Sequence, residues 1–142
     1  MLLYLDICCF NRPFDPQDQT RVRWETEAKL EVQERIRSGG VALAWSYAMD
    51  LENHANPFAE RRHSIARWRD LATADATASS SLLDLATDLE ARGLKPLDSL
   101  HLACAITCRC DFLLTTDDGI LRKRRVVGEI RILNPTEFIL LP

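Results

Sequence analysis

The sequence predicts an α/β fold built on a parallel sheet. Short apolar runs alternate along the chain with longer segments of helical periodicity, which is the order that strand–helix–strand units produce. The runs are apolar at most positions, as is typical of strands that are buried on both faces. The chain has 142 residues, 46% of them apolar, and this size and composition suit one domain over residues 1–142.

The strands are predicted from four apolar runs. Each run is short and is followed by turn residues or by the start of a helix. The second run leads into Ser46, whose hydroxyl suits a helix N-cap. The predicted strands cover residues 2–7, 41–45, 112–115 and 131–133.

Helical segments connect these strands. Residues 17–38 carry an apolar stripe that repeats every fourth residue, and Gly39-Gly40 ends the pattern. The core is expected to contain the stripe residues Trp24, Ala28, Val32 and Ile36, together with Trp45 and Trp68. Further helices are predicted from Ser46 to Asn56-Pro57, over 58–73, from 82 to Gly93, and over about 97–109. Residues 76–81 are interpreted as a turn that leads into a helix.

Composition excludes several classes of protein. There are 18 Lys and Arg against 21 Asp and Glu, and the formal net charge of -3 excludes a strongly basic nucleic-acid coat protein. No apolar stretch approaches the roughly 20 residues of a membrane helix, and the N-terminus lacks the pattern of a signal peptide. We therefore expect a cytoplasmic protein with no membrane partner. The five cysteines show no C-x-x-C spacing, so we expect reduced thiols.

Four acids are expected at one edge of the sheet. Asp6 ends the first predicted strand, and Asp117 follows the third. Glu52 stands on the helix after the second strand, and Asp98 stands in the first turn of an otherwise apolar helix. Because ligands of open parallel sheets bind beyond the carboxyl ends of the strands, we expect these side chains to lie close together.

Converging carboxylates predict a bound cation. Two of them about 4 Å apart repel by about 4 kcal/mol at an effective dielectric of 20, and a proton or a cation must relieve this repulsion. Hard oxygen ligands favour Mg²⁺ or Mn²⁺. Such an ion supports metal-assisted hydrolysis of phosphodiesters.

Four motifs follow one another between residues 2 and 134. They are Tyr4-Leu5-Asp6, the stretch from Ser46 to Glu52-Asn53, Gly93-Leu94-Lys95-Pro96-Leu97-Asp98-Ser99-Leu100-His101-Leu102-Ala103, and Asp111-Phe112-Leu113-Leu114-Thr115-Thr116-Asp117. In order and spacing they resemble the PIN-domain ribonucleases, in particular the VapC-like toxins of toxin–antitoxin pairs. The third and fourth motifs are the most specific.

The resemblance implies a three-layer fold in which helices flank a central parallel sheet of four to five strands. It implies Mg²⁺-dependent endonucleolytic cleavage of RNA without a covalent intermediate. Asp6, Glu52, Asp98 and Asp117 would then be a catalytic quartet that holds one or two divalent ions. The implied partners are an RNA substrate, a cognate antitoxin protein and a second copy of the chain in a homodimer.

The chain departs from the family pattern directly after Asp6. The family often has Thr and then Ser or Asn there, whereas this chain has Ile7-Cys8-Cys9, and Asn11 is a candidate replacement for the missing polar group. Asp118 competes with Asp117 for the fourth acid position. Asp50 is a weak competitor of Glu52, because residues two apart on a helix point to different faces.

Other polar residues are assigned lesser roles. His101 lies three residues after Asp98 on the same helix face, and we interpret it as a hydrogen-bonded, partly buried residue ahead of a role in orienting a carboxylate. Candidate contacts to substrate or partner are Asn11, Arg12, Arg122 and Arg124.

Two other functions remain open. One is an inactive PIN-like module that binds RNA or protein, which the altered segment after Asp6 keeps in view. The other is a phosphatase of the haloacid-dehalogenase type, whose chemistry requires an acid two residues after the nucleophile, where this chain has Cys8. Metal titration separates the first from the nuclease, and an acyl-phosphate trapped on Asp6 would support the second.

Overall fold

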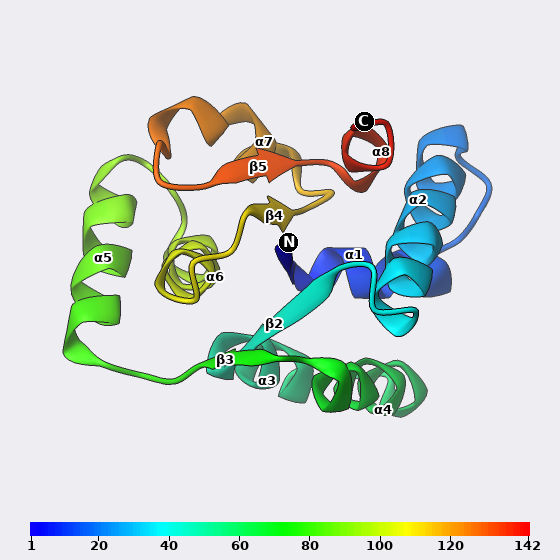
Figure 1. Cartoon of the computed structure of the whole chain (residues 1–142), viewed down its shortest axis with the longest axis horizontal. Coiled ribbons are helices and arrows are strands. Elements are labelled where there is room, and N and C mark those ends of the chain that lie inside the picture. The colour runs from blue at the N-terminus through cyan, green and yellow to red at the C-terminus, as the bar shows by residue number, and fades with distance from the viewer.

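The computed structural model describes residues 1–142 and contains a five-stranded sheet in which all neighbouring strands are parallel. The strands lie in the order β3-β2-β1-β4-β5, so β1 is central (Figure 1). Their bounds are Leu2–Leu5 for β1, Ala42–Ser46 for β2, Ala74–Ala76 for β3, Phe112–Leu114 for β4 and Arg131–Leu133 for β5. The predicted α/β fold with four to five parallel strands is confirmed.

Helices cover both faces of this sheet. Helices α5 and α6 lie on one side and α2 and α8 on the other (Figure 1). The helices are α1 (Ile7–Asn11), α2 (Thr20–Arg37), α3 (Tyr47–His54), α4 (Ala59–Ala66), α5 (Ser80–Ala91), α6 (Pro96–Thr107), α7 (Asp118–Arg122) and α8 (Pro135–Phe138). Short 3₁₀ segments cover Arg12–Phe14, Arg67–Leu71 and Arg124–Val126. None of the helices has the length and apolar character needed to cross a membrane.

The central strands are buried on both faces, which explains their continuous apolar sequence. Leu3 and Leu43 are fully buried, and Tyr4 pairs with Ala44 on one side and with Leu113 on the other. Each buried leucine contributes roughly 1.5–3 kcal/mol relative to an exposed one. Burial on both faces therefore holds β1 rigidly in the middle of the sheet, where its last residue leads into the site.

Local signals set the ends of the helices. Ser46 accepts a hydrogen bond from the Met49 amide at 3.2 Å, which confirms it as the N-cap of α3. Pro96 occupies the first turn of α6, where its missing N–H costs nothing. Gly39, with φ of 80°, follows the end of α2 in a conformation that other residues rarely adopt.

Several predicted boundaries are wrong. The first strand ends at Leu5, because Asp6 caps α1 and residues 7–11 are helical. The predicted helix over 58–73 divides into α4 and a 3₁₀ segment. Strand β3 was not predicted, because its three residues form no apolar run and pair only with β2 at the edge of the sheet.

The prediction that Trp24 lies in the core is also wrong, since this side chain is 64% exposed. The face of α2 that packs inward carries Val22, Glu25, Ala28, Lys29, Val32, Gln33 and Ile36, and Trp24 lies outside it. The core positions of Trp45 and Trp68 are confirmed. All five cysteines are free thiols, as expected.

Candidate metal centre

Polar side chains from four elements approach the carboxyl edge of the sheet. Asp6 directly follows β1, and Thr115 and Asp117 follow β4. Glu52 lies on α3, which follows β2, and Asp98 lies in the first turn of α6. Because β1 lies between β2 and β4, Asp6 stands at the centre of this edge.

Asp6 is held by three hydrogen-bond donors. Its Oδ1 accepts from the Ile7 amide at 2.8 Å, and its Oδ2 accepts from the Thr115 hydroxyl at 2.8 Å and from the Cys8 thiol at 3.4 Å. The residue is only 5% exposed. These bonds fix the carboxylate in one orientation, as a preorganised ligand requires.

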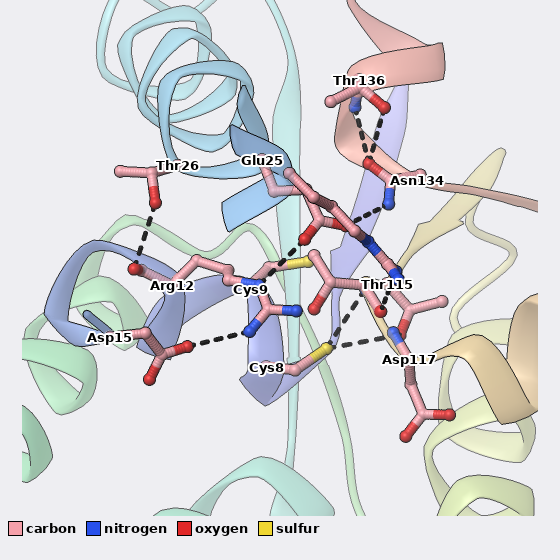
Figure 2. Close-up of polar contacts among 12 residues, drawn as sticks. Cys8, Cys9, Arg12, Asp15, Glu25, Thr26, Thr115, Asp117, Asn134 and Thr136 are labelled. Carbon is pink, nitrogen blue, oxygen red and sulfur yellow. Dashed lines mark hydrogen bonds and ion pairs between the residues drawn. The ribbon is translucent and has the colours of Figure 1, made fainter. Parts of the chain in front are cut away.

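The segment after Asp6 compensates for its departure from the family pattern with a thiol. The Cys8 sulfur lies 3.3 Å from the Thr115 hydroxyl and accepts from the Thr116 amide at 3.3 Å, so Cys8 and Thr115 lie side by side (Figure 2). Asn11 donates instead to the Ile7 carbonyl at 3.4 Å. Support for Asp6 thus comes from Cys8 and Thr115, neither of which was assigned this role from the sequence.

His101 connects Glu52 to the core. Its Nε2 lies 3.2 Å from Glu52 Oε1, and its Nδ1 lies 2.5 Å from the hydroxyl of Tyr4, which in turn contacts Ser46 at 2.7 Å. His101 is 1% exposed, so it is hydrogen-bonded as predicted and more deeply buried than expected. It also orients a carboxylate, the role that the sequence placed second. The carboxylate is that of Glu52, and the spacing of three residues between His101 and Asp98 gave no sign of this contact.

The pKa of His101 is raised even though burial alone acts to lower it. The hydrogen bond with Glu52 and the negative charges of Asp6, Glu52 and Asp98 outweigh the loss of hydration. Protonation of His101 would give both ring nitrogens a hydrogen to donate, one toward Glu52 and one toward Tyr4. In that protonated form the imidazole would act on Glu52 both as a hydrogen-bond donor and as a source of positive charge.

Asp98 experiences the crowding of negative charge most strongly. Its pKa is raised from 3.8 to about 6, mainly by partial burial and then by the charges of Asp6 and Asp117. His101 and Lys95 act in the opposite direction and are the weaker influences. Asp98 is consequently a carboxylate whose ionised form a nearby cation would stabilise.

Asp117 and Asp118 are both candidates for the fourth acid position, and their contacts distinguish them. Asp117 caps α7, and its Oδ1 accepts from the amides of Gly119 at 2.7 Å and Ile120 at 3.1 Å. Asp118 instead points to solvent and forms a bidentate ion pair with Arg21 at 2.8 and 2.9 Å. Asp117, and not Asp118, is therefore the acid whose charge acts on Asp98.

Asp50 is likewise occupied away from the acids. It accepts a hydrogen bond from Trp45 Nε1 at 2.8 Å and pairs with Arg69 at 3.2 Å. These contacts tie α3 to β2 and to the 3₁₀ segment Arg67–Leu71, and they leave Glu52 as the acid of this helix that joins Asp6.

The structure brings two of the four predicted acids into one group that can hold a metal ion. Asp6, Glu52 and His101 each offer a ligand atom, and these atoms lie within 4.8 Å of one another. Asp98 and Asp117 lie outside this group; the charge of Asp98 acts on His101, and that of Asp117 acts on Asp98. Both nitrogens of His101 are engaged in hydrogen bonds, whereas a carboxylate oxygen that accepts one hydrogen bond keeps a further lone pair for a metal ion, and such oxygen ligands fit Mg²⁺ or Mn²⁺.

A cleft opens beside the acids. Its volume is about 480 Å³, and its walls include Cys8, Asn11, Glu52, Phe58 and Arg61. The Arg61 guanidinium lies 4.6 Å from the centre of the Phe58 ring. The cleft thus places Glu52 near an exposed aromatic ring and near Arg61, which also pairs with Asp15 at 3.4 Å.

The predicted arginine contacts have partners within the protein. Arg12 pairs with Asp15 and Glu25, each at 3.0 Å (Figure 2). Arg124 pairs with Glu137 at 2.9 Å, whereas Arg122 is exposed on α7. Their roles toward substrate or partner remain predictions.

Glu25 was not singled out from the sequence. It is 1% exposed, and it binds Arg12, Arg21 at 3.4 Å and Asn134 at 2.5 Å. It therefore ties α2 to the loop after α1 and to the start of α8. The i,i+4 spacing from Arg21 was its only local sign, because Arg12 and Asn134 lie outside α2.

Comparison with known proteins identifies the fold. No family model matches the sequence, and no curated protein sequence matches it. A chain in the crystal structure of FitAcB from Neisseria gonorrhoeae superposes with a TM-score of 0.59 at 14% identity, over 95% of this chain and 98% of that one. A chain of VapBC2 from Rickettsia felis, bound to a DNA fragment from their promoter, gives a TM-score of 0.56 at 17% identity, over 94% and 98%. The fold is therefore the α/β fold of the PIN domains that the sequence resembles.

Proposed function

We propose that this chain is a divalent-metal-dependent endoribonuclease and the toxin of a toxin–antitoxin pair. The observation that carries the proposal is the convergence of Asp6 and Glu52, with Asp98 close by, at the carboxyl edge of a PIN-like sheet. A surface that only bound RNA would gain nothing from clustered negative charge facing a polyanion. The likeness to VapBC2 in fold supports the toxin assignment, because the sequence motifs resemble the VapC-like toxins.

Asp6 and Glu52 would hold Mg²⁺ or Mn²⁺, with Asp98 and Asp117 completing the quartet directly or through water. When bound, such an ion lowers the pKa of a coordinated water and neutralises charge on a phosphoryl oxygen. The chain's own contribution is to hold the ligands in place before the substrate arrives. Thr115 and Cys8 hold Asp6, and His101 holds Glu52.

The cleft is suited to a single-stranded segment of RNA. Unstacked bases bind on exposed aromatic rings and on arginine planes, and Phe58 is 56% exposed beside Arg61. Both residues line the same cleft as Glu52, so a base stacked on Phe58 would bring its phosphate toward the acids.

The test is cleavage of a mixed RNA pool by purified protein free of any antitoxin, with Mg²⁺, with Mn²⁺ or with EDTA. We expect cleavage only with metal, and a loss of about 100-fold or more in Asp6→Asn and Asp98→Asn. Asp118→Asn is the matched control, because it removes a neighbouring exposed acid and leaves the cluster intact.

Two outcomes would overturn the proposal. One is metal-independent cleavage, or cleavage at the wild-type rate by folded Asp6→Asn or Asp98→Asn. The other is a folded wild-type protein that neither cuts RNA nor binds Mn²⁺ or Mg²⁺, which would favour the inactive RNA- or protein-binding module.

A further inference from the structure

A second cavity lies away from the acid cluster, between α1, α2, α4 and the 3₁₀ segment Arg67–Leu71. Its volume is about 180 Å³, equivalent to about six waters at roughly 30 Å³ each. Aromatic rings of Phe10 and Trp68 form part of its wall. None of its lining residues belongs to the metal centre or to the cleft beside it.

Two deeply buried polar side chains line this cavity. Lys29 and Gln33 stand one turn apart on the inward face of α2, and each is only 4% exposed. Neither side chain makes a hydrogen bond to another residue, and no acidic residue lines the cavity. Three residues, Tyr47, Asn53 and Ser99, have a fully enclosed polar side-chain atom without a hydrogen-bond partner. The polar ends of Lys29 and Gln33 are not among these enclosed atoms, so they reach the open space of the cavity.

Aromatic rings compensate the Lys29 ammonium only in part. Its Nζ lies 5.2 Å from the centre of the Phe10 ring and 5.8 Å from that of Trp68, distances at which a cation–π contact contributes about 1–2 kcal/mol. A buried charge with no negative partner costs several kcal/mol. The pKa of Lys29 is lowered from 10.5 to about 7, mainly by burial; Cys9 acts in the opposite direction, and the positive charge of Arg37 contributes a smaller lowering.

Arg37 adds a second cation to the cavity. Its guanidinium lies 4.7 Å from the centre of the Trp68 ring, and the residue is exposed. Ser64 lines the opposite wall. The cavity thus presents one buried amine, one amide and a cation closer to solvent, against aromatic walls.

We propose that this cavity binds a small organic carboxylate, whose negative group pairs with Lys29 and Gln33 and whose apolar body packs against Phe10 and Trp68. One deeply buried cation balances one negative charge, whereas a phosphate brings a charge of about -1.5 to -2 near neutral pH. The aromatic walls favour a flat or apolar body. The small volume excludes drug-sized ligands, which occupy roughly 300–1,000 Å³.

The test is binding of benzoate to the full chain, measured by isothermal titration calorimetry and by the NMR signals of the Trp68 ring. We expect a Kd of about 1 mM or tighter for the wild type. Benzamide, which has the same shape without the charge, and inorganic phosphate should bind at least about tenfold more weakly. Binding should also be tighter at pH 6 than at pH 8, because the carboxylate pairs with protonated Lys29.

Two variants remove the site by different means. Lys29→Met replaces the amine with an apolar side chain of similar length, and Gln33→Glu provides Lys29 with an internal carboxylate one turn away. Both should weaken benzoate binding at least tenfold and remain folded by circular dichroism. Lys95→Met changes an exposed lysine and should leave binding unchanged.

The proposal is wrong if benzoate does not bind the wild type at millimolar concentration. It is equally wrong if benzamide binds as tightly as benzoate, or if folded Gln33→Glu binds benzoate as the wild type does. RNA cleavage plays no part in these measurements, so their result is independent of the proposed nuclease.

Discussion

Replacing Asp98 with asparagine should stabilise the metal-free protein at neutral pH. Asp98 has its pKa raised from 3.8 to about 6, mainly by burial and then by Asp6 and Asp117. Its ionised form is therefore less favourable in the folded than in the unfolded chain. The contribution of Asp98 to stability is fully present below about pH 4 and is lost as the pH rises through about 6.

The expected gain in stability follows from this rise in the pKa of Asp98. A rise of about two pH units at about 1.4 kcal/mol each sets an upper bound of about 3 kcal/mol. Asp98 is partly exposed, and solvent screens these charges, which reduces the expected gain of Asp98→Asn to about 1 kcal/mol. For a chain of this length, that gain raises the melting temperature by about 3 °C.

Thermal unfolding followed by circular dichroism in EDTA measures this effect. We expect Asp98→Asn to melt about 3 °C above the wild type at pH 7.5 and only about 1 °C above it at pH 4.5, where Asp98 is protonated in the folded protein. Asp84→Asn, on the exposed face of α5, is the control and should change neither value. Saturating Mg²⁺ should reverse the order, because it stabilises only a protein that binds it, by about 2.7 kcal/mol at 100 times its Kd. A variant that melts at or below the wild type at pH 7.5 in EDTA would refute the argument from charge crowding.

The remaining predictions concern the metal, the support of Asp6 and the core. Affinity for Mn²⁺, measured by titration calorimetry, should fall by up to about tenfold per pH unit below pH 6, because Asp98 must lose its proton to serve as a ligand. A constant affinity from pH 7 to pH 5 would exclude Asp98 from the site. Thr115→Val keeps the shape of the side chain but removes a donor to Asp6, and we expect RNA cleavage and Mn²⁺ affinity to fall about 10- to 100-fold in a folded protein. Trp24→Ala should change the free energy of unfolding by no more than about 0.5 kcal/mol, whereas Trp45→Ala should lower it by about 3–5 kcal/mol; equal losses in urea unfolding would contradict their different burial.

The sequence predicted the strands that lie in the middle of the sheet because burial on both faces leaves a continuous apolar run. Strand β1 and strand β4 carry such runs, and their last residues place Asp6 and Asp117 at one edge. Strand β3 is an edge strand with the sequence Ala-Asp-Ala, and it exists through its pairing with β2. A strand that depends on its neighbour in this way leaves no periodic trace in its own residues.

Helix α2 shows a second limit. A spacing of four residues predicted that Trp24 would face the core. The inward face of α2 instead carries polar residues, among them Glu25, Lys29 and Gln33. Polar residues at buried positions contradict the simple pattern, and each needs a partner or a cavity to explain its burial. Glu25 has ion pairs on two sides, and Lys29 and Gln33 line a cavity. Only the three-dimensional arrangement supplies these partners.

The acid cluster was predictable to the extent that Asp6, Asp98 and Asp117 stand at the end of a strand or the start of a helix, whereas Glu52 lies late in α3. The groups that hold the acids were not, because their bonds join residues far apart in the chain. Thr115 reaches Asp6 across 109 residues, and His101 reaches Glu52 across 49. Such contacts depend on the order of the strands in the sheet, and no single motif specifies that order.

Cys8 illustrates the consequence for judging a departure from a family pattern. From the sequence alone, a cysteine in place of a hydroxyl or an amide suggests a weakened site. In the structure the same sulfur donates toward Asp6 and accepts from the Thr116 amide, so it performs both functions of a hydroxyl at longer distances. Since a thiol is the weaker donor, the shorter bond from Thr115 carries most of the restraint on Asp6. The departure therefore shifts the support of the carboxylate from one neighbour to another and does not argue for an inactive protein.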